Sequence, residues 1–455
     1  MDHVTIIGGG LAGCEAAWQL GRRGINVRLL EMRPAVMGPA HHTADLAELV
    51  CSNSFKSDDA STATGLLKRE LGDLRSLVLA VARRTSVPAG AALAVDRARF
   101  SAEVTAALEG LPTVTVERRE AVAIPAGDVI VAAGPLASAP LESALVPLVG
   151  VDRLAFYDAA APIVDAETID RSRVFAASRW EKGQGSDYLN CPMDREQYQH
   201  FVAALVTAER TTLKEFERRE LFQACQPIEE VARTGVDALR FGALKPIGLT
   251  DPITGLRPWA VVQLRSENRA TTAYNLVGFQ TNLTFSEQRR VFGMVPGLAA
   301  AEFLRYGVMH RNSFIDAPRL LTSGMALRSD PRIRFAGQLA GTEGYLEAAA
   351  TGLLAALDVV RARGSYPPFV LPPTTALGSL ISYATDPETV DYQPMHVNFG
   401  LVPPLPERVR GKRVRYEAYA HRAADDFARC LDGAPWIATT LAPGCTDVDP
   451  AGAPS

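Results

Sequence analysis

Two of the six cysteines stand in surroundings that could make a thiol reactive. Cys51 lies in the polar segment 48–57, beside serine and asparagine and close to Lys56. Polar neighbours and a nearby positive charge favour the thiolate, which is the nucleophilic form. Cys225 ends an amphipathic segment just before Pro227, where the chain must turn. At each position the alternative is structural: a half-buried loop residue for Cys51 and a helix-terminal packing residue for Cys225.

A second candidate is a basic stretch near the C-terminal end of the chain. It contains Arg408, Arg410, Lys412, Arg413 and Arg415, and tyrosines follow at 416 and 419. Cations interleaved with aromatic rings are suited to nucleic acid, although a solvated helix face has the same composition. The net charge of −4 gives no general attraction to RNA. Any RNA contact must therefore be local.

The remaining composition restricts the class of protein. No CxxC pair and no Cys/His cluster with metal spacing occurs, so we expect neither a disulfide framework nor a metal site. The first strand begins almost at once, and no run approaches the roughly 20 apolar residues of a membrane span. These features predict a soluble cytoplasmic protein.

The N-terminal segment must position a nucleotide if the chain binds one. The apolar run Val4–Ile7 breaks into six residues, Gly8, Gly9, Gly10, Leu11, Ala12 and Gly13, and a helical pattern follows to about residue 23. The first glycine allows a tight turn, the third lets a pyrophosphate approach the backbone, and the last lets helix and strand pack closely. The free N–H groups and positive dipole at the helix start then face the phosphates.

A second strand pattern, Val27–Leu30, closes on Glu31, 18 residues after the last glycine of the loop. A carboxylate at this place can accept hydrogen bonds from a ribose. The order strand, glycine loop, helix, strand and acid predicts a dinucleotide-binding βαβ unit.

A similar texture returns near the other end of the chain. Residues 333–338 read as a strand that ends at Gly337 and Gln338, and Gly344 and Tyr345 precede a helix of small residues over 346–357. Such a helix can lie close to a ligand or to a neighbouring strand. One fingerprint at the start and one glycine–helix element near the end favour FAD over NAD. No second GxGxxG occurs, so NADH or NADPH would visit the flavin only transiently.

A chain of 455 residues is too long for one compact core. We predict an α/β fold: a discontinuous FAD-binding, Rossmann-like domain of the glutathione-reductase type, formed by 1–149 and 326–430. An α+β domain, 150–325, is inserted into it, and within it 261–264 and 274–279 look like paired strands. Residues 431–455 lack periodicity and read as a disordered tail.

Several segments together resemble the folate- and FAD-dependent tRNA (uracil-5-)-methyltransferases. The resemblance runs in order from residue 3 to about 430, with mild departures at Ala243-Leu244 and Thr342. Its segments are 6–17, 30–34, 49–57, 187–193, 225–232, 241–248, 274–281, 305–312 and 335–350.

This resemblance implies methylation of C5 of a uridine in the T-loop of tRNA, at position 54. The carbon would come from 5,10-methylenetetrahydrofolate, and reduced FAD would carry the methylene unit and supply the hydride. Cys225 would add to uracil C6 and Cys51 would act near the flavin, as the C5 base or a guard of the methylene unit, although the two roles could be exchanged. Tyr345 would lie beside the flavin ring, and Arg33 would join the cofactor-binding residues. No obligate protein partner is implied.

Three alternatives remain open at this point. The chemistry could act on a ribosomal RNA uridine instead. FAD proteins that modify the tRNA wobble uridine share the texture, but they carry a long C-terminal helical domain for which this chain has no room. A flavin-dependent NAD(P)H oxidoreductase without an RNA substrate would leave both cysteines inert.

Overall fold

The N-terminal apolar run forms the centre of a parallel sheet. The computed structural model describes residues 3–38, 40–150, 154–159, 161–181, 186–211, 226–268, 270–307, 309–389 and 392–438. Strand β1 (His3–Ile7) lies between β2 (Asn26–Glu31) and β7 (Val129–Val131), and pairs in parallel with both. Strand β6 (Val114–Arg118) extends the sheet beyond β2, and β16 (Ile333–Phe335) extends it beyond β7. The order β16-β7-β1-β2-β6 therefore joins both ends of the chain in one sheet.

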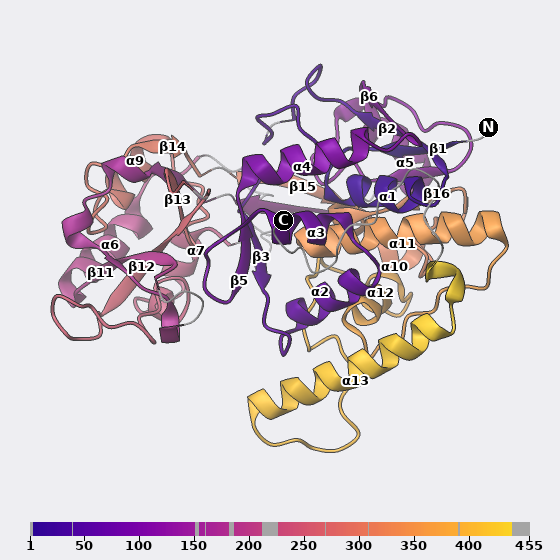
Figure 1. The fold of residues 1–455 in the computed structure, drawn as a ribbon. Coiled ribbons are helices and arrows are strands. Elements are labelled where there is room, and N and C mark those ends of the chain that lie inside the picture. The colour runs from indigo at the N-terminus through magenta and orange to yellow at the C-terminus, as the bar shows by residue number, and fades with distance from the viewer. Residues whose placement is uncertain are drawn as a thin grey trace.

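Helices cover this sheet and lead into its loops (Figure 1). They are α1 (Leu11–Gly21), α2 (Ala63–Asp73), α3 (Leu77–Arg84), α4 (Arg97–Glu109), α5 (Ala139–Val149), α10 (Ala317–Leu320), α11 (Tyr345–Gly364) and α12 (Ala376–Thr385). A small antiparallel sheet of β3 (Ser54–Ser57), β4 (Ser86–Val87) and β5 (Ala92–Val95) lies beside them. The strand β3 follows directly after Cys51.

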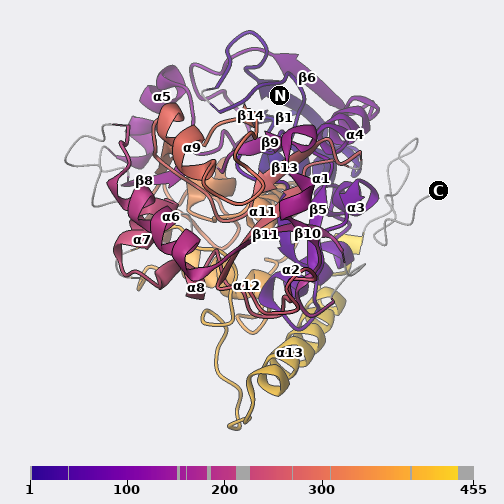
Figure 2. The ribbon, with the colours of Figure 1, turned by 90° about the vertical axis from the view of Figure 1, so that its left-hand side faces the viewer.

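A second, antiparallel sheet builds the lobe at the left of Figure 1, which faces the viewer in Figure 2. Its strands are β9 (Ile163–Asp165), β10 (Phe175–Ala176), β11 (Tyr188–Met193), β12 (Ala260–Ser266), β13 (Ala273–Leu276) and β14 (Phe303–Arg305). Helices α6 (Arg195–Thr207), α7 (Ile228–Arg233), α8 (Ala238–Phe241) and α9 (Phe285–Phe292) accompany it. The expected pairing of 261–264 with 274–279 is confirmed in β12 and β13, where Leu264 faces Leu276.

The two lobes have separate apolar cores. One large buried cluster combines residues from both ends of the chain, from Val4 to Leu145 and from Phe314 to Ile437. The other lies between Val164 and Leu298. Strands β8 (Leu154–Ala159) and β15 (Met309–Phe314) pair with each other and connect the lobes. The predicted α/β class with an inserted α+β part is confirmed, while the residue boundaries of the domains stay a prediction.

Regular secondary structure continues past residue 430, where the sequence predicts a disordered tail. Helix α13 (Lys412–Asp432) projects below the lobe that contains the parallel sheet (Figures 1 and 2), and a short 3-10 turn, η7 (Pro435–Ala438), follows it. The indole of Trp436 stacks on Tyr366, with ring centroids 5.4 Å apart. Residues 431–438 thus differ from the predicted tail because an aromatic anchor packs them, and 439–455 lie outside the described residues. No helix in the described part of the chain has the length and apolarity to cross a membrane.

Candidate active site

The glycine loop has the geometry that a bound dinucleotide requires. Gly8 has a φ of +101°, and a Cβ there would lie 2.5 Å from the carbonyl oxygen of Ala132. A Cβ on Gly13 would collide with the carbonyl oxygen of Gly8, so the helix packs directly on the turn. Gly10 differs, because no atom lies within 4 Å of the place its Cβ would take. The loop is therefore closed toward the protein and open at Gly10.

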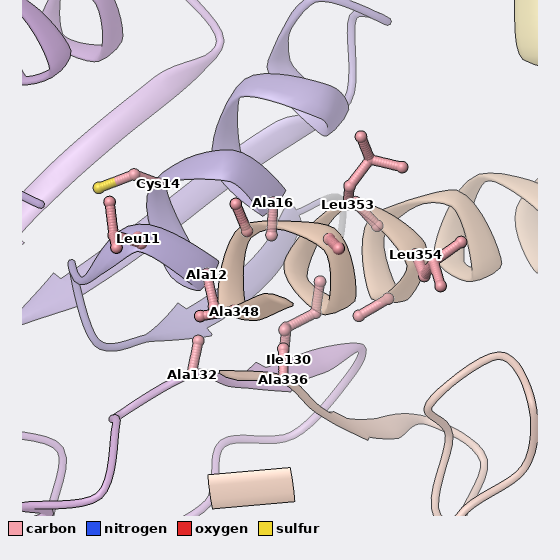
Figure 3. Close-up of a cluster of buried hydrophobic side chains, with 14 of the residues drawn as sticks. Leu11, Ala12, Cys14, Ala16, Ile130, Ala132, Ala336, Ala348, Leu353 and Leu354 are labelled. Atoms are coloured by element: carbon pink, nitrogen blue, oxygen red, sulfur yellow. The ribbon is translucent and has the colours of Figure 1, made fainter. Parts of the chain in front are cut away.

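Helix α11 lies closely against α1, as Figure 3 shows for Ala348 beside Ala12. A Cβ on residue 352, which is glycine, would collide with the backbone of Ala12. The small-residue helix therefore also packs closely on a helix, which the sequence did not predict. Its first turn still reaches the ligand side, because Tyr345 and Ala348 line the pocket described next.

A single pocket of about 540 Å³ runs along the carboxyl ends of the parallel strands. The described residues that line it include most of those predicted for the cofactor, and add several that the sequence did not indicate. The predicted ones are Gly8, Gly9, Gly10, Leu11, Ala12, Glu31, Arg33, Gly337, Gln338, Gly344 and Tyr345, together with Cys51. The added ones include His41, Glu48, Lys56, Arg119, Gln280, Glu343 and His396. Gly13 supports the loop from behind.

The carboxylate of Glu31 organises one end of the pocket. It accepts hydrogen bonds from the Gly9 N–H (2.9 Å) and from the Arg33 guanidinium (2.8 and 3.1 Å). Burial alone would raise the pKa of Glu31, but hydrogen bonds and charge from Arg33 outweigh it and hold that pKa below its usual range. Arg33 also binds Glu48 at 2.9 Å, and Glu48 accepts the backbone N–H groups of His42 and Thr43. The glycine loop and the segment 41–48 are thus tied together.

Cys51 and Tyr345 meet in the wall of the same pocket. The phenolic oxygen of Tyr345 lies 3.2 Å from the Cys51 Sγ and accepts the backbone N–H groups of Cys51 (3.1 Å) and Ser52 (3.0 Å). Its hydroxyl donates to the carbonyl oxygen of Ser52 at 2.8 Å. The ring of Tyr345 also packs against Phe55, with centroids 5.5 Å apart. One phenol therefore fixes the backbone on both sides of the thiol.

Two arginines hold the same loop from behind. Arg97, at the start of α4, donates to the carbonyl oxygens of Leu49 and Val50. Arg305, in β14 of the other lobe, donates to the carbonyl oxygens of Val50 (2.9 Å) and Cys51 (3.3 Å). Sequence reasoning missed both, because nothing local marks an arginine that acts across 48 or 255 residues.

Further polar groups lie along the pocket wall near Tyr345. The Lys56 ammonium lies 3.5 Å from the buried carboxylate of Glu347, which also accepts the N–H of Val397 at 3.1 Å. Gln338 donates to Glu343 at 2.7 Å. Burial lowers the pKa of His396, which favours its neutral form. Of these residues, the sequence predicted only Gln338 as a cofactor contact. The others belong to no motif that would have marked them as residues of the site.

The second predicted cysteine, Cys225, lies outside the described residues. The chain is described again from Gln226, and the N–H of Ile228 donates to the carbonyl oxygen of Gln280 at 2.7 Å. Gln280 itself lines the pocket. Of the other cysteines in the described part, Cys14 and Cys191 are fully buried, which raises the pKa of each thiol far above its ordinary value.

The basic stretch lies apart from the pocket, before and within the first turn of α13. Arg408, Arg410, Lys412, Arg413 and Arg415 are all exposed. Lys412 and Arg415 lie over the Tyr416 ring, at 5.5 and 5.9 Å from its centroid. Within the part of the chain that the structure describes, Arg413 alone of these five forms a close ion pair, with Glu417 at 2.8 Å, so most of this charge faces solvent.

Comparison with known proteins places this architecture. The family described as glucose inhibited division protein A matches residues 3–365. A methylenetetrahydrofolate–tRNA-(uracil-5-)-methyltransferase TrmFO from Thermosynechococcus vestitus is 54% identical over 94% of both chains. The protein of the same name from Heliobacterium modesticaldum is 54% identical over 94% of this chain and 98% of its own, and that from Geobacter sulfurreducens is 52% identical over 96% and 99%.

The chain belongs to the TrmFO family. The resemblance drawn from the sequence motifs is thereby confirmed. Among solved structures, two crystal forms of Aquifex aeolicus GidA superpose with TM-scores of 0.67 and 0.66 at 16% identity. They cover 94% of this chain and 73% and 76% of their own, and they support the fold of this TrmFO family member.

Proposed function

We propose that this protein methylates C5 of the uridine at position 54 in the T-loop of tRNA, with 5,10-methylenetetrahydrofolate as the carbon donor. The observation that carries the proposal is one pocket that the glycine loop, Cys51 and Tyr345 all line, with the thiol and the phenol in contact. The names of relatives more than half identical over nearly the whole chain supply the substrate class.

The described residues fit FAD as the resident cofactor. The open space above Gly10 leaves room for a pyrophosphate at the start of α1, and the oxygens of Glu31 suit a ribose. Tyr345, Gln338 and Gly344 also line this pocket, and we propose that the flavin ring lies beside them. When bound and reduced, FAD would supply a carrier for the methylene unit and a hydride. We propose NADH or NADPH as the source of those electrons.

The protein's own chemistry would then be divided between two thiols. Uracil C5 is a poor nucleophile until a thiolate adds to C6, and we assign this addition to Cys225. Ile228, three residues further along the chain, donates its N–H to the carbonyl oxygen of the pocket-lining Gln280, so the segment that follows Cys225 is tied to the pocket. We assign to Cys51 the removal of the C5 proton or the guarding of the methylene unit, after which the Cys225 thiolate leaves C6.

The exposed cations near α13 would bind the RNA backbone. Lys412, Arg413 and Arg415 lie in the first turn of a helix of 21 residues, where the dipole is positive. That turn holds no acidic residue, although Arg413 pairs with Glu417 one turn on. Such a concentration of positive charge is unfavourable in the free protein, and phosphates would relieve it. The half-buried ring of Tyr416 lies beside Lys412 and Arg415 and adds an aromatic group to this surface. We propose this surface as a contact for tRNA in the cytoplasm, without an obligate protein partner.

RNA mass spectrometry tests the proposal and its alternatives together. Purified protein, methylenetetrahydrofolate and NADPH are supplied with a tRNA transcript or with ribosomal RNA, and nucleosides are located by fragment mapping. We expect 5-methyluridine at position 54 of tRNA. Modification of ribosomal RNA alone would change the substrate, and NADPH oxidation without any modified RNA would indicate a plain oxidoreductase.

A T-arm RNA with 5-fluorouridine tests the division between the thiols. Fluorine cannot leave as a proton does, so the C6 adduct is trapped. We expect a denaturation-resistant adduct whose peptide contains Cys225. Attachment at Cys51 would exchange the two roles, and methylation that persists in both Cys51→Ala and Cys225→Ala variants would end the thiolate mechanism.

A further inference from the structure

The loop that carries Cys51 is surrounded by an excess of buried positive charge. Arg97 and Arg305 bind its carbonyl groups, and Arg265 binds the Asn53 side chain next to it at 2.8 Å. The side chain of Arg97 is 17% exposed and Arg265 is 6% exposed. One carboxylate, that of Glu267, pairs with Arg97 and is itself buried. Among the described residues, these three guanidinium groups face one paired carboxylate, so two positive charges have no counter-ion there.

Burial makes this imbalance costly, because a charge removed from water must be paired or neutralised. Arginine does not lose its proton at ordinary pH, so the balance must come from an anion. The cluster shows the strain of crowded charge: burial and the neighbouring Arg97 lower the pKa of Arg305 to about 10. In addition, the Nε of Arg305 is buried and finds no acceptor among the described residues.

Cys51 is the group best placed to supply the missing anion. After Arg97, the groups whose charge acts most on Arg305 are Glu267, Tyr345 and Cys51. Tyr345 is no counter-ion, because burial raises the pKa of its phenol well above the ordinary value. The neutral phenol of Tyr345 lies 3.2 Å from the Cys51 Sγ. Its hydroxyl hydrogen, which is now donated to the Ser52 carbonyl oxygen, could be donated to a Cys51 thiolate instead.

Several other charged groups along the pocket wall have partners among the described residues, and Arg119 pairs with Glu117. Glu31 and Glu48 pair with Arg33, and Lys56 pairs with Glu347. Glu343 accepts a hydrogen bond from Gln338, and burial favours the neutral form of His396 by lowering its pKa.

We propose that Arg97 and Arg305 hold Cys51 as a thiolate in the resting enzyme, so that it is a base before RNA arrives. Arg305 belongs to the inserted lobe, so the protonation state of Cys51 depends on the position of that lobe relative to the Cys51 loop. Both arginines are positioning residues, since they act through the Cys51 loop. The inference rests on the proposed role of Cys51 in the reaction.

The test is the pH dependence of alkylation, which needs no RNA. Purified protein with bound flavin reacts with iodoacetamide between pH 5.5 and 9.5, and each cysteine is followed by peptide mass spectrometry. Cys430 is the internal reference, because it is half-buried outside the cluster and burial raises the pKa of its thiol. An ordinary thiol with a pKa near 8.5 is only about 1% ionised at pH 6.5. We expect a nearly flat profile for Cys51, with reaction at pH 6.5 up to ~100-fold faster than for such a thiol.

Arg305→Met should restore a pH-dependent profile at Cys51, with reaction at pH 6.5 slowed about tenfold or more. Arg305→Lys keeps the charge and should retain most of the reactivity, which separates charge from packing. Flavin absorbance and the urea midpoint establish that each variant is folded. If Arg305→Met does not fold, Glu267→Gln enlarges the positive excess and should leave the profile flat.

Three results would overturn the inference: a wild-type Cys51 that titrates near 8.5, one that stays unreactive throughout, or a folded Arg305→Met with an unchanged profile. A flat Cys51 profile in a protein that methylates no RNA would instead count against the proposed function alone.

Discussion

Removing one oxygen atom, in Tyr345→Phe, should cost far more stability than a phenol usually contributes. The hydroxyl serves two N–H donors, of Cys51 and Ser52, and one carbonyl acceptor, of Ser52. Each buried group left without a partner costs about 1–3 kcal/mol, and water entering from the pocket can satisfy part of the loss. The ring still packs on Phe55. We therefore expect the free energy of unfolding to fall by about 2–4 kcal/mol.

The matched control is Tyr383→Phe. That hydroxyl donates to the carbonyl oxygen of Gln393 at 2.9 Å and accepts its N–H at 3.2 Å, but these bonds are open to solvent. Its loss should cost less than about 1 kcal/mol, because water replaces both bonds. Urea unfolding of the flavin-free proteins measures both variants. Equal costs for the two variants, with unchanged denaturant slopes, would refute the role assigned to the Tyr345 hydroxyl.

Three further perturbations address the cofactor site and the RNA surface. Gly10→Val should fold normally, because its Cβ meets no atom, yet lose flavin absorbance, whereas Gly13→Val should fail to fold because its Cβ meets backbone. Glu31→Gln should remove a pH-dependent part of the stability, because the pKa of Glu31 is depressed in the folded state. The contribution of Glu31 is complete above about pH 4.3 and is lost as the pH falls through the lower folded-state pKa. Thermal unfolding measured as a function of pH checks this. Lys412→Gln combined with Arg415→Gln should weaken tRNA binding and reduce the slope of log affinity against log salt by up to about 2, with flavin content unchanged.

The cofactor loop could be predicted from the sequence because its constraints are local. A turn at positive φ, a helix that packs on it and a strand ending in Glu31 are set by neighbours in the chain, and the structure places all of them as expected. The joining of β16 to this sheet also followed from the returning glycine texture near residue 337.

The surroundings of Cys51 could not be predicted in this way. Arg97, Arg305 and Tyr345 reach the Cys51 loop from three other elements, across up to 294 residues of chain. The small-residue helix was expected close to a ligand or a strand, and its first turn does line the pocket, but the close contact of its glycine at 352 with α1 was not predicted. In such cases a composition of small residues predicts that the helix approaches another element closely, but it does not predict which element that is.

The origin of the methyl carbon tests the central claim most directly. A tRNA transcript is incubated with the protein, NADPH and methylenetetrahydrofolate labelled in its methylene carbon, and a parallel reaction receives labelled S-adenosylmethionine instead. The account predicts label from the folate in the C5 methyl group of uridine 54, and none from S-adenosylmethionine. Label that arrives only from S-adenosylmethionine, or a C5 methyl group without the folate carbon, would contradict it.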